Sequence, residues 1–218
     1  MKLDISKIVQ HRLRPGQFMD AKHEKKQIYL HHTAGGPDAV SVARYFDTKP
    51  ERVATAFIIG ANGTIVQCFS SRDWAYHLGL KESIFKASKV PYISLDPISI
   101  GIEVCNWGPI SFKNGKYYNY VGGEVNASNV TTLEKPYKGH KLWFTYTDAQ
   151  IESLRQLVVY LCETYDIPKD YNESIWDIDL DALKGNKGIF THNSVRKDKS
   201  DMYPCPRVIK MLKNLKGE

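Results

Sequence analysis

A buried strand pattern that ends in two histidines limits the folds open to this chain. Residues 26–32 end in His31-His32, and Gly35-Gly36-Pro37 follows, a combination that stops a strand and permits a tight turn. A helix pattern begins at Asp38. Strand patterns that alternate with helix patterns are typical of an α/β layered fold, in which helices cover a central sheet.

Three further sequence patterns support the prediction of an α/β fold. Residues 53–59 and 64–69 are rich in strand formers and are joined through Asn62-Gly63, which predicts a tight hairpin. Thr147 and Gln150 have the spacing of a capping box, and an apolar helical face follows them, so we expect a helix that ends before Pro168. A short final helix is expected from Pro206.

In residues 98–105, apolar side chains alternate with small or polar ones, which predicts a strand with one functional face. Isoleucines and a valine point to one side, whereas Ser99, Gly101 and Glu103 point to the other. We therefore expect the Glu103 carboxylate to stand in the middle of a strand, on a face cleared by small neighbours.

Composition predicts one domain made without an export signal. The chain has 218 residues, of which 42% are hydrophobic, and it lacks the run of about 18 apolar residues that a membrane span needs. The N-terminus has no apolar signal core. We expect a single domain over residues 1–218, made in the cytoplasm, with an inserted segment at about 107–145 that carries a small hairpin at Asn114-Gly115.

The charge and the cysteines exclude several classes of partner. A net charge of +6 and a pI near 9.0 favour a polyanion, either nucleic acid, an anionic membrane or a cell-wall polymer. No arginine-rich run interleaved with aromatics is present, so we expect no nucleic-acid groove and no membrane insertion. The four cysteines are widely spaced, which predicts buried thiols rather than a disulfide framework or a four-cysteine zinc clip.

The histidines suggest a hydrolytic metal site. In a strand, His31 and His32 face opposite sides, so one of them enters a given site. His192 ends another strand pattern and is followed by a polar loop with Asp198 and Asp201. Two imidazoles, a carboxylate and a separate Glu103 are what a zinc hydrolase requires. His77 lies between Trp74 and a glycine, and either lines a cleft or is a structural histidine.

Five motifs in order now give a family resemblance. They are Tyr29 to Ala34, Phe57 to Thr64, Trp74 to Gly79, Ser99 to Glu103, and Thr191-His192 with Lys199 and Asp201. The chain resembles the amidase-2 type of N-acetylmuramoyl-L-alanine amidases, which share a fold with T7 lysozyme, AmpD and the peptidoglycan recognition proteins. The resemblance implies a central mixed sheet flanked by helices and covers about residues 25–215, apart from the inserted segment.

The resemblance also implies a set of zinc ligands. In the family, the first histidine of the first motif and the histidine of the last motif bind zinc, which here are His31 and His192. The third family ligand follows a lysine by two residues, which here is Asp201 after Lys199. Cys205 remains the alternative third ligand, since a thiolate binds zinc well but fits the family spacing less closely. His32, His77 and Trp74 are expected to contact substrate or to support the site.

The implied reaction is cleavage of the amide bond between N-acetylmuramic acid and L-alanine. Zinc activates the water, Glu103 takes its proton and returns it to the leaving amine, and Lys199 stabilises the oxyanion. Where some relatives have a tyrosine, this chain has Ala54-Thr55-Ala56, so Glu103 is expected to act alone. The expected partner is bacterial peptidoglycan, and the protein is expected to be a monomer. It would act on the cell wall or in the periplasm after its release from the cytoplasm, for example as a phage endolysin. The alternatives are a non-catalytic peptidoglycan-binding module and, with less support, a metal-dependent nuclease.

Overall fold

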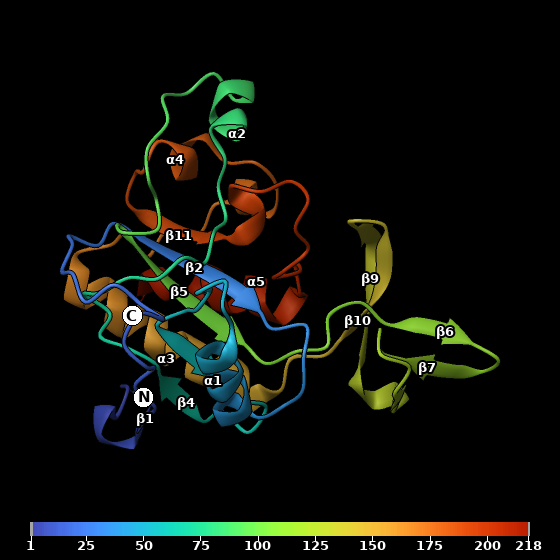
Figure 1. Ribbon diagram of the computed structural model, residues 1–218. Helices are drawn as coiled ribbons and strands as arrows, with labels where there is room; N and C mark the ends of the chain where they lie inside the picture. The colour runs from blue at the N-terminus through green and yellow to red at the C-terminus, as the bar shows by residue number, and fades with distance from the viewer. Residues whose placement is uncertain (1, 218) are drawn as a thin grey trace.

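A six-stranded mixed sheet forms the centre of the computed structural model, which describes residues 2–217 (Figure 1). In spatial order the strands are β1 (Val9–Gln10), β4 (Ile65–Gln67), β3 (Phe57–Ile59), β5 (Ser99–Val104), β2 (Gln27–His32) and β11 (Gly188–Thr191). β3 and β4 are antiparallel, and every other neighbouring pair is parallel. The predicted α/β fold with a mixed sheet is confirmed.

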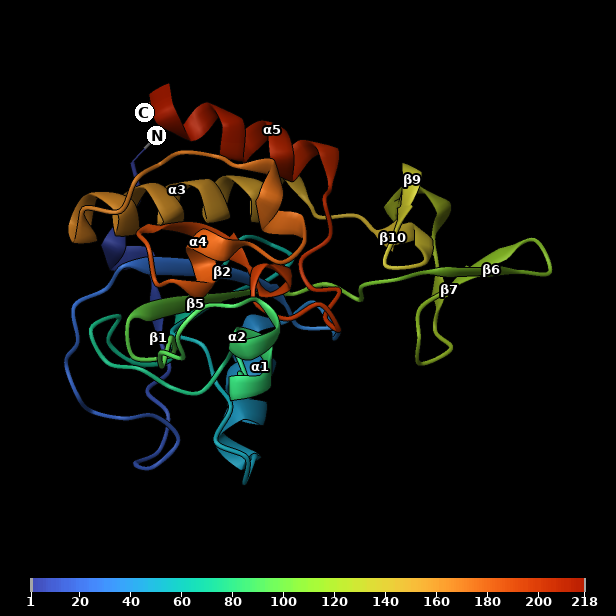
Figure 2. The same ribbon diagram turned by 90° about the horizontal axis from the view of Figure 1, so that it is seen from above.

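Helices cover both faces of this sheet (Figure 2). α3 (Asp148–Tyr165) lies on one face with α5 (Pro206–Asn214) packed outside it, and α1 (Ala39–Thr48) lies on the other face. The short helices α2 (Glu82–Ala87) and α4 (Leu180–Leu183) lie in the connections. Within residues 2–217, none of the helices has both the length and the apolar character required to cross a membrane.

The helix starts follow from local side-chain chemistry. The Asp38 carboxylate accepts a hydrogen bond from the Ser41 amide and caps α1. At α3, Thr147 Oγ1 accepts from the Gln150 amide and the Gln150 side chain accepts from the Thr147 amide, which is the predicted capping box. Pro206 occupies the first turn of α5, where its missing N–H costs nothing. The three helices predicted from these signals are confirmed.

The capping box gives a stability prediction. Thr147 Oγ1 also donates to the Ala61 carbonyl at 2.6 Å, so Thr147→Ala removes the cap and a link to the β3–β4 turn. We expect the free energy of unfolding to fall by about 1 kcal/mol or more. Thr164→Ala, at the exposed end of the same helix, is the matched control in denaturant titrations. Equal unfolding midpoints for the two variants would contradict the role given to the cap.

The predicted hairpin at Asn62-Gly63 forms, but its strands and turn differ from the prediction. β3 and β4 are shorter than residues 53–59 and 64–69, and the connection runs over Gly60 to Thr64, closed by a Gly60 N–H to Thr64 carbonyl bond. Only Gly63 in this turn has a positive φ, of 83°. Asn62 does not share the positive φ expected of an Asn-Gly turn, because it instead bonds the Thr64 amide through its side chain.

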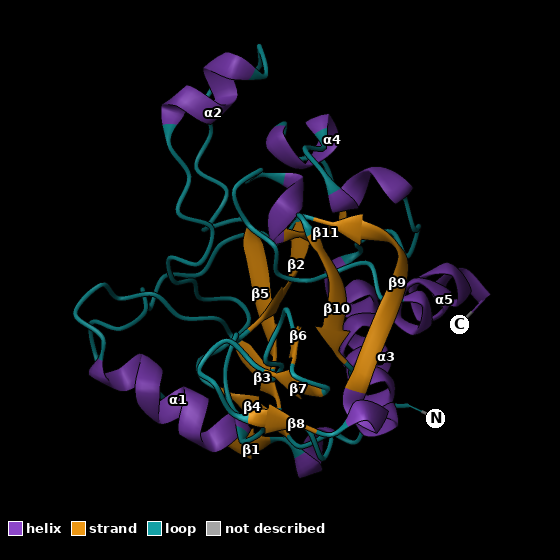
Figure 3. Cartoon of the chain, turned by 90° about the vertical axis from the view of Figure 1, so that its right-hand side faces the viewer, coloured by secondary structure: helices purple, strands orange, loops and turns teal. Residues whose placement is uncertain are grey.

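The inserted segment forms two small sheets beside the core (Figure 3). β6 (Ser111–Lys113), β7 (Lys116–Tyr118) and β8 (Glu124–Val125) make one, and β9 (Val130–Tyr137) pairs with β10 (His140–Phe144) in the other. The predicted hairpin at Asn114-Gly115 is confirmed, with φ values of 49° and 77°.

Aromatic stacking anchors this segment to the core. Trp143 of β10 is fully buried and stacks on Tyr203 with ring centroids 4.7 Å apart, and Tyr203 stacks in turn on Tyr146 at 5.1 Å. The Tyr203 hydroxyl donates to the Phe144 carbonyl at 3.0 Å. Because Tyr203 lies two residues after Asp201, these contacts hold the loop that carries the Asp201 carboxylate against the inserted segment.

Candidate metal centre

Three parallel strands bring the candidate residues to one edge of the sheet. Thr191 of β11 pairs with Leu30 of β2, so His192, directly after β11, lies beside His31. On the other side of β2, Glu103 of β5 is the register partner of His31. The carboxyl ends of parallel strands meet at one edge of an α/β sheet, which is where such folds bind ligands.

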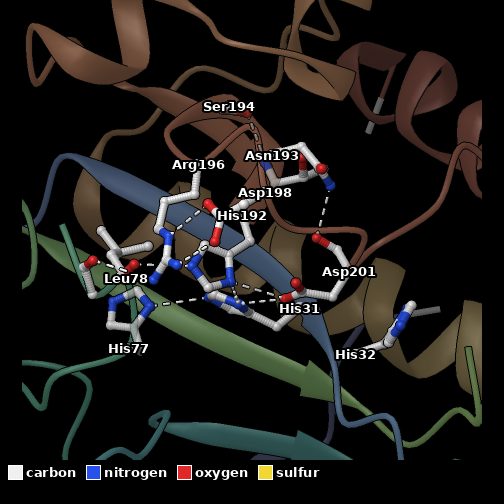
Figure 4. Close-up of polar contacts among 12 residues, drawn as sticks. His31, His32, His77, Leu78, His192, Asn193, Ser194, Arg196, Asp198 and Asp201 are labelled. Carbon is white, nitrogen blue, oxygen red and sulfur yellow. Dashed lines mark hydrogen bonds and ion pairs between the residues drawn. The ribbon is translucent and has the colours of Figure 1, made fainter. Parts of the chain in front are cut away.

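His31, His192 and Asp201 converge on one point (Figure 4). The Nδ1 atoms of the two histidines lie 3.2 Å apart, and Asp201 Oδ2 lies 3.0 Å from the first and 3.1 Å from the second. Both rings are buried. Zinc bonds of about 2.0–2.1 Å in a tetrahedron place ligand atoms about 3.3 Å apart, so the spacing fits a small metal ion.

The outer nitrogen of each ring shows where its proton lies. His192 Nε2 is 3.0 Å from the Leu78 carbonyl, which only accepts, so this nitrogen donates. His31 Nε2 is 3.0 Å from His77 Nδ1. Ser99 Oγ donates to the Asp96 carbonyl and lies 2.8 Å from His77 Nε2, so His77 donates to Ser99 and accepts from His31.

These bonds leave a lone pair on each inner nitrogen of the neutral rings. Both Nδ1 atoms then face the Asp201 carboxylate with no hydrogen between the three atoms, an arrangement that a cation stabilises. Burial lowers the pKa of His31 to about 4, which keeps this ring neutral near pH 7. The donor set therefore fits a divalent metal.

The loop before α5 places Asp201, and neither Asp198 nor Cys205, at the position of the third ligand. The Asn193 side-chain amide donates to the Asp201 carbonyl at 2.9 Å and fixes the loop against the turn after β11. Asp198, the other candidate carboxylate, is exposed and pairs with Arg196. Cys205 is buried at the start of α5 and does not belong to the group of metal-ligating side chains found in residues 2–217. The geometry thus favours Asp201 over Cys205.

Glu103 stands beside the metal cluster with one oxygen unsatisfied. A pocket of about 440 Å³, here called the metal-site pocket, is lined by His31, His192, Asp201, Glu103 and Lys199 among others. Glu103 Oε2 is buried and has no hydrogen-bond partner within the described chain. Burial, and then the Asp201 charge, raises the pKa of Glu103 well above its ordinary value, while Lys199 acts in the opposite direction. A carboxyl with a raised pKa beside an unsatisfied oxygen is the type of group that serves as a general acid and base.

The three expected substrate or support residues lie in different places. His77 touches the wall of the metal-site pocket, but both its ring nitrogens are occupied by His31 and Ser99. His32 points away from the cluster and its Nδ1 lies 3.1 Å from the Tyr146 hydroxyl (Figure 4). Trp74 packs edge-on against His23 and Tyr76 and does not line the pocket. Substrate contacts by these residues stay predictions.

The sequence analysis missed the support behind His31. The bonds from His31 through His77 to Ser99 orient the first ligand, and the Asp96 carboxylate accepts from the His77 and Leu78 amides. Gly101 makes room for this arrangement, because a Cβ there would lie 3.0 Å from His77 Nδ1 and 2.7 Å from Thr55 Cγ2. The small residues noted on the Glu103 face of β5 were the available signal.

Comparisons with known proteins identify the family of this chain. The sequence profile of the amidase-2 family, described as N-acetylmuramoyl-L-alanine amidase, matches residues 21–206. The chain belongs to this family. The match spans every member of the metal cluster together with Glu103 and Lys199. None of the proteins with curated annotation matches the chain significantly.

Solved structures with the same fold include other proteins of this kind. PlyL is 15% identical with a TM-score of 0.55 over 96% of each chain, and the catalytic domain of XlyA is 16% identical with a TM-score of 0.54 over 96% of this chain and 99% of its own. An AmpD derivative is 16% identical with a TM-score of 0.50 over 97% of this chain and 99% of its own. At these identities the likeness shows a shared amidase-2 fold.

Proposed function

We propose that this amidase-2 protein is a zinc-dependent N-acetylmuramoyl-L-alanine amidase, which hydrolyses the amide bond between N-acetylmuramic acid and L-alanine in peptidoglycan. The observation that carries the proposal is the convergence of three possible ligand atoms, from His31, His192 and Asp201, beside the unpartnered Glu103 oxygen. Membership of the family supports the substrate class.

His31, His192 and Asp201 would hold the zinc ion through Nδ1, Nδ1 and Oδ2. When bound, zinc makes water nucleophilic at neutral pH and polarises a carbonyl as a Lewis acid. The buried His77 and the Leu78 carbonyl fix the outer nitrogens of the two rings, so the inner nitrogens stay unprotonated and aimed at the metal.

Two side chains of the pocket would transfer the proton and stabilise the negative charge that develops on the carbonyl oxygen. Glu103 Oε2 accepts the proton of the attacking water and returns it to the L-alanine amine as the amide bond breaks. Lys199 lines the same pocket and supplies positive charge to the oxygen of the former carbonyl. Where some relatives have a tyrosine, this chain has Ala54-Thr55-Ala56, and the Thr55 hydroxyl donates to the Phe57 carbonyl, which leaves Glu103 with both proton transfers.

The test is release of stem peptides from purified sacculi. We expect free L-alanine amino groups to appear without new reducing ends, the activity to vanish with a chelator, and stoichiometric zinc to restore it. Stoichiometric binding of sacculi without cleavage would instead favour a peptidoglycan-binding module. Nicking of plasmid DNA would favour a nuclease.

The place of action follows from the substrate. We propose that the protein acts on the bacterial cell wall, as an endolysin or a cellular amidase, and that its net charge of +6 assists association with the anionic envelope. Weaker binding to sacculi as salt is raised is the expected result.

The support behind His31 gives a prediction on zinc affinity. His77→Ala removes the acceptor for His31 Nε2, and Gly101→Ala pushes a methyl group against the His77 ring. Because outer partners of metal ligands orient them, we expect either change to weaken zinc binding by about 10–100-fold. Competition with a fluorescent zinc chelator measures this, with the exposed His23→Ala as control. Unchanged affinity in both variants would show that His31 is oriented by other contacts.

A further inference from the structure

The metal-site pocket continues into two further pockets along the same side of the molecule. A pocket of about 630 Å³ beside α1, the α1 pocket, shares Thr33, Ala34 and Glu103 with the metal-site pocket. A third pocket of about 400 Å³ on the inserted hairpin, the insertion pocket, shares Tyr120 with the α1 pocket. Shared lining residues thus connect the three pockets in a row from Glu103 to the insertion, and this row is here called the groove.

Tyr120 joins the last two parts of this groove and is held in place although it is exposed. Its side chain is 63% exposed, yet its hydroxyl donates to the Ala34 carbonyl at 2.7 Å. Its ring lies 6.2 Å from that of Trp107, which packs against Gly36. An aromatic surface fixed before binding loses little conformational entropy when a ligand packs on it.

The lining of the groove suits a neutral, ring-shaped ligand. The insertion pocket presents the rings of Tyr118 and Tyr120 together with the polar Ser111 and Asn114 and a single charge, on Lys113. Sugar rings match this lining, because their C–H faces are apolar and their rims carry hydroxyl and amide groups.

Charge argues against a stem peptide in the middle of the groove. Of the acidic side chains that line the α1 pocket, Asp38 is the one that lies outside the metal-site pocket. Stem peptides carry free carboxylates, which Asp38 would repel, whereas the saccharide units of a glycan strand are uncharged when their lactyl groups are amide-linked.

We propose that this groove binds the glycan strand of peptidoglycan and that Tyr120 of the insertion is the platform on which a saccharide ring packs. The proposal deepens the proposed function and names the part of the substrate that the insertion recognises. Saccharides adjoining the cleaved unit would extend over Tyr120, so the insertion favours polymeric substrate over a single muropeptide.

The first test separates polymer from single-sugar substrate. For Tyr120→Ala we expect kcat/KM on sacculi to fall by about 5- to 10-fold, as the loss of one aromatic contact predicts, with no change on N-acetylmuramic acid carrying only its peptide. Tyr120→Phe keeps the ring but loses the hydroxyl that holds it to the Ala34 carbonyl, so its loss on sacculi is expected to be smaller than that of Tyr120→Ala. Phe112→Ala removes an aromatic that is 54% exposed on the same hairpin but outside the groove, and serves as control.

The second test does not depend on catalysis. Binding of peptide-free glycan strands to chelator-treated protein is measured by calorimetry, and Tyr120→Ala should weaken it by the same factor while circular dichroism and the melting temperature stay at wild-type values. Equal glycan binding by wild type and Tyr120→Ala, or competition by free stem peptide for this site, would overturn the proposal. Glycan binding through Tyr120 without any cleavage would refute only the amidase function.

Discussion

Glu103→Ala is expected to abolish amide cleavage while the protein keeps its zinc and its fold. A positioned general acid and base contributes about 10²–10⁴-fold to rate, and the proposed function gives both proton transfers to Glu103. The loss should fall on kcat rather than KM, since Glu103 acts on the proton and not on substrate binding. Initial rates of peptide release, with zinc content measured on the same samples, test this expectation.

Stability provides a second readout on the same variant. Glu103 Oε2 is buried without a partner, and an unpartnered buried polar atom costs free energy, so its removal should leave the melting temperature unchanged or raise it. Glu134→Ala, on the exposed strand β9, is the matched control and should keep full activity. Retention of more than a tenth of wild-type kcat by Glu103→Ala would show that another group moves the proton.

Removal of any one metal ligand is expected to have the largest effect. His192→Ala and Asp201→Ala each leave two ligands, and we expect a loss of zinc affinity beyond the about 10–100-fold typical of outer partners, with activity falling to background. Zinc should raise the melting temperature of the wild type, because it binds the folded state, and should not raise that of either variant.

Cys205→Ser decides between the two candidate third ligands. The thiol is buried at the start of α5 and lies outside the cluster, so we expect this variant to bind one zinc ion with wild-type affinity. The assignment of Asp201 would be wrong if Cys205→Ser lost its zinc while Asp201→Ala kept it. Elemental analysis after dialysis, together with the zinc-dependent shift in melting temperature, gives the answer.

The predicted insertion contacts the segments that carry the proposed metal ligands. The Trp143, Tyr203 and Tyr146 stack joins β10 to the loop that follows Asp201, and the Tyr146 hydroxyl reaches His32. Tyr120 reaches the loop after β2. These contacts connect the inserted segment with both the His31 and the Asp201 segments.

Local signals in the sequence were sufficient to predict the helix starts and turns that depend only on neighbouring residues. The Asp38 cap, the Thr147 capping box and Pro206 mark helix starts where the structure has them, because hydrogen bonds within one turn decide these positions. The Asn114-Gly115 turn is of the same kind. In the turn after β3 only Gly63 has a positive φ, since Asn62 bonds the Thr64 amide through its side chain instead.

The sequence by itself determined the α/β class, the main helices and the residue types that can hold a metal, because periodicity, caps and turn residues act over a few positions. Only the tertiary structure decided that Asp201 rather than Cys205 meets the two histidines, that His77 stands behind His31, and that Tyr120 reaches the groove. The order β5-β2-β11 sets which strand ends are neighbours, and long-range packing, not local pattern, fixes that order.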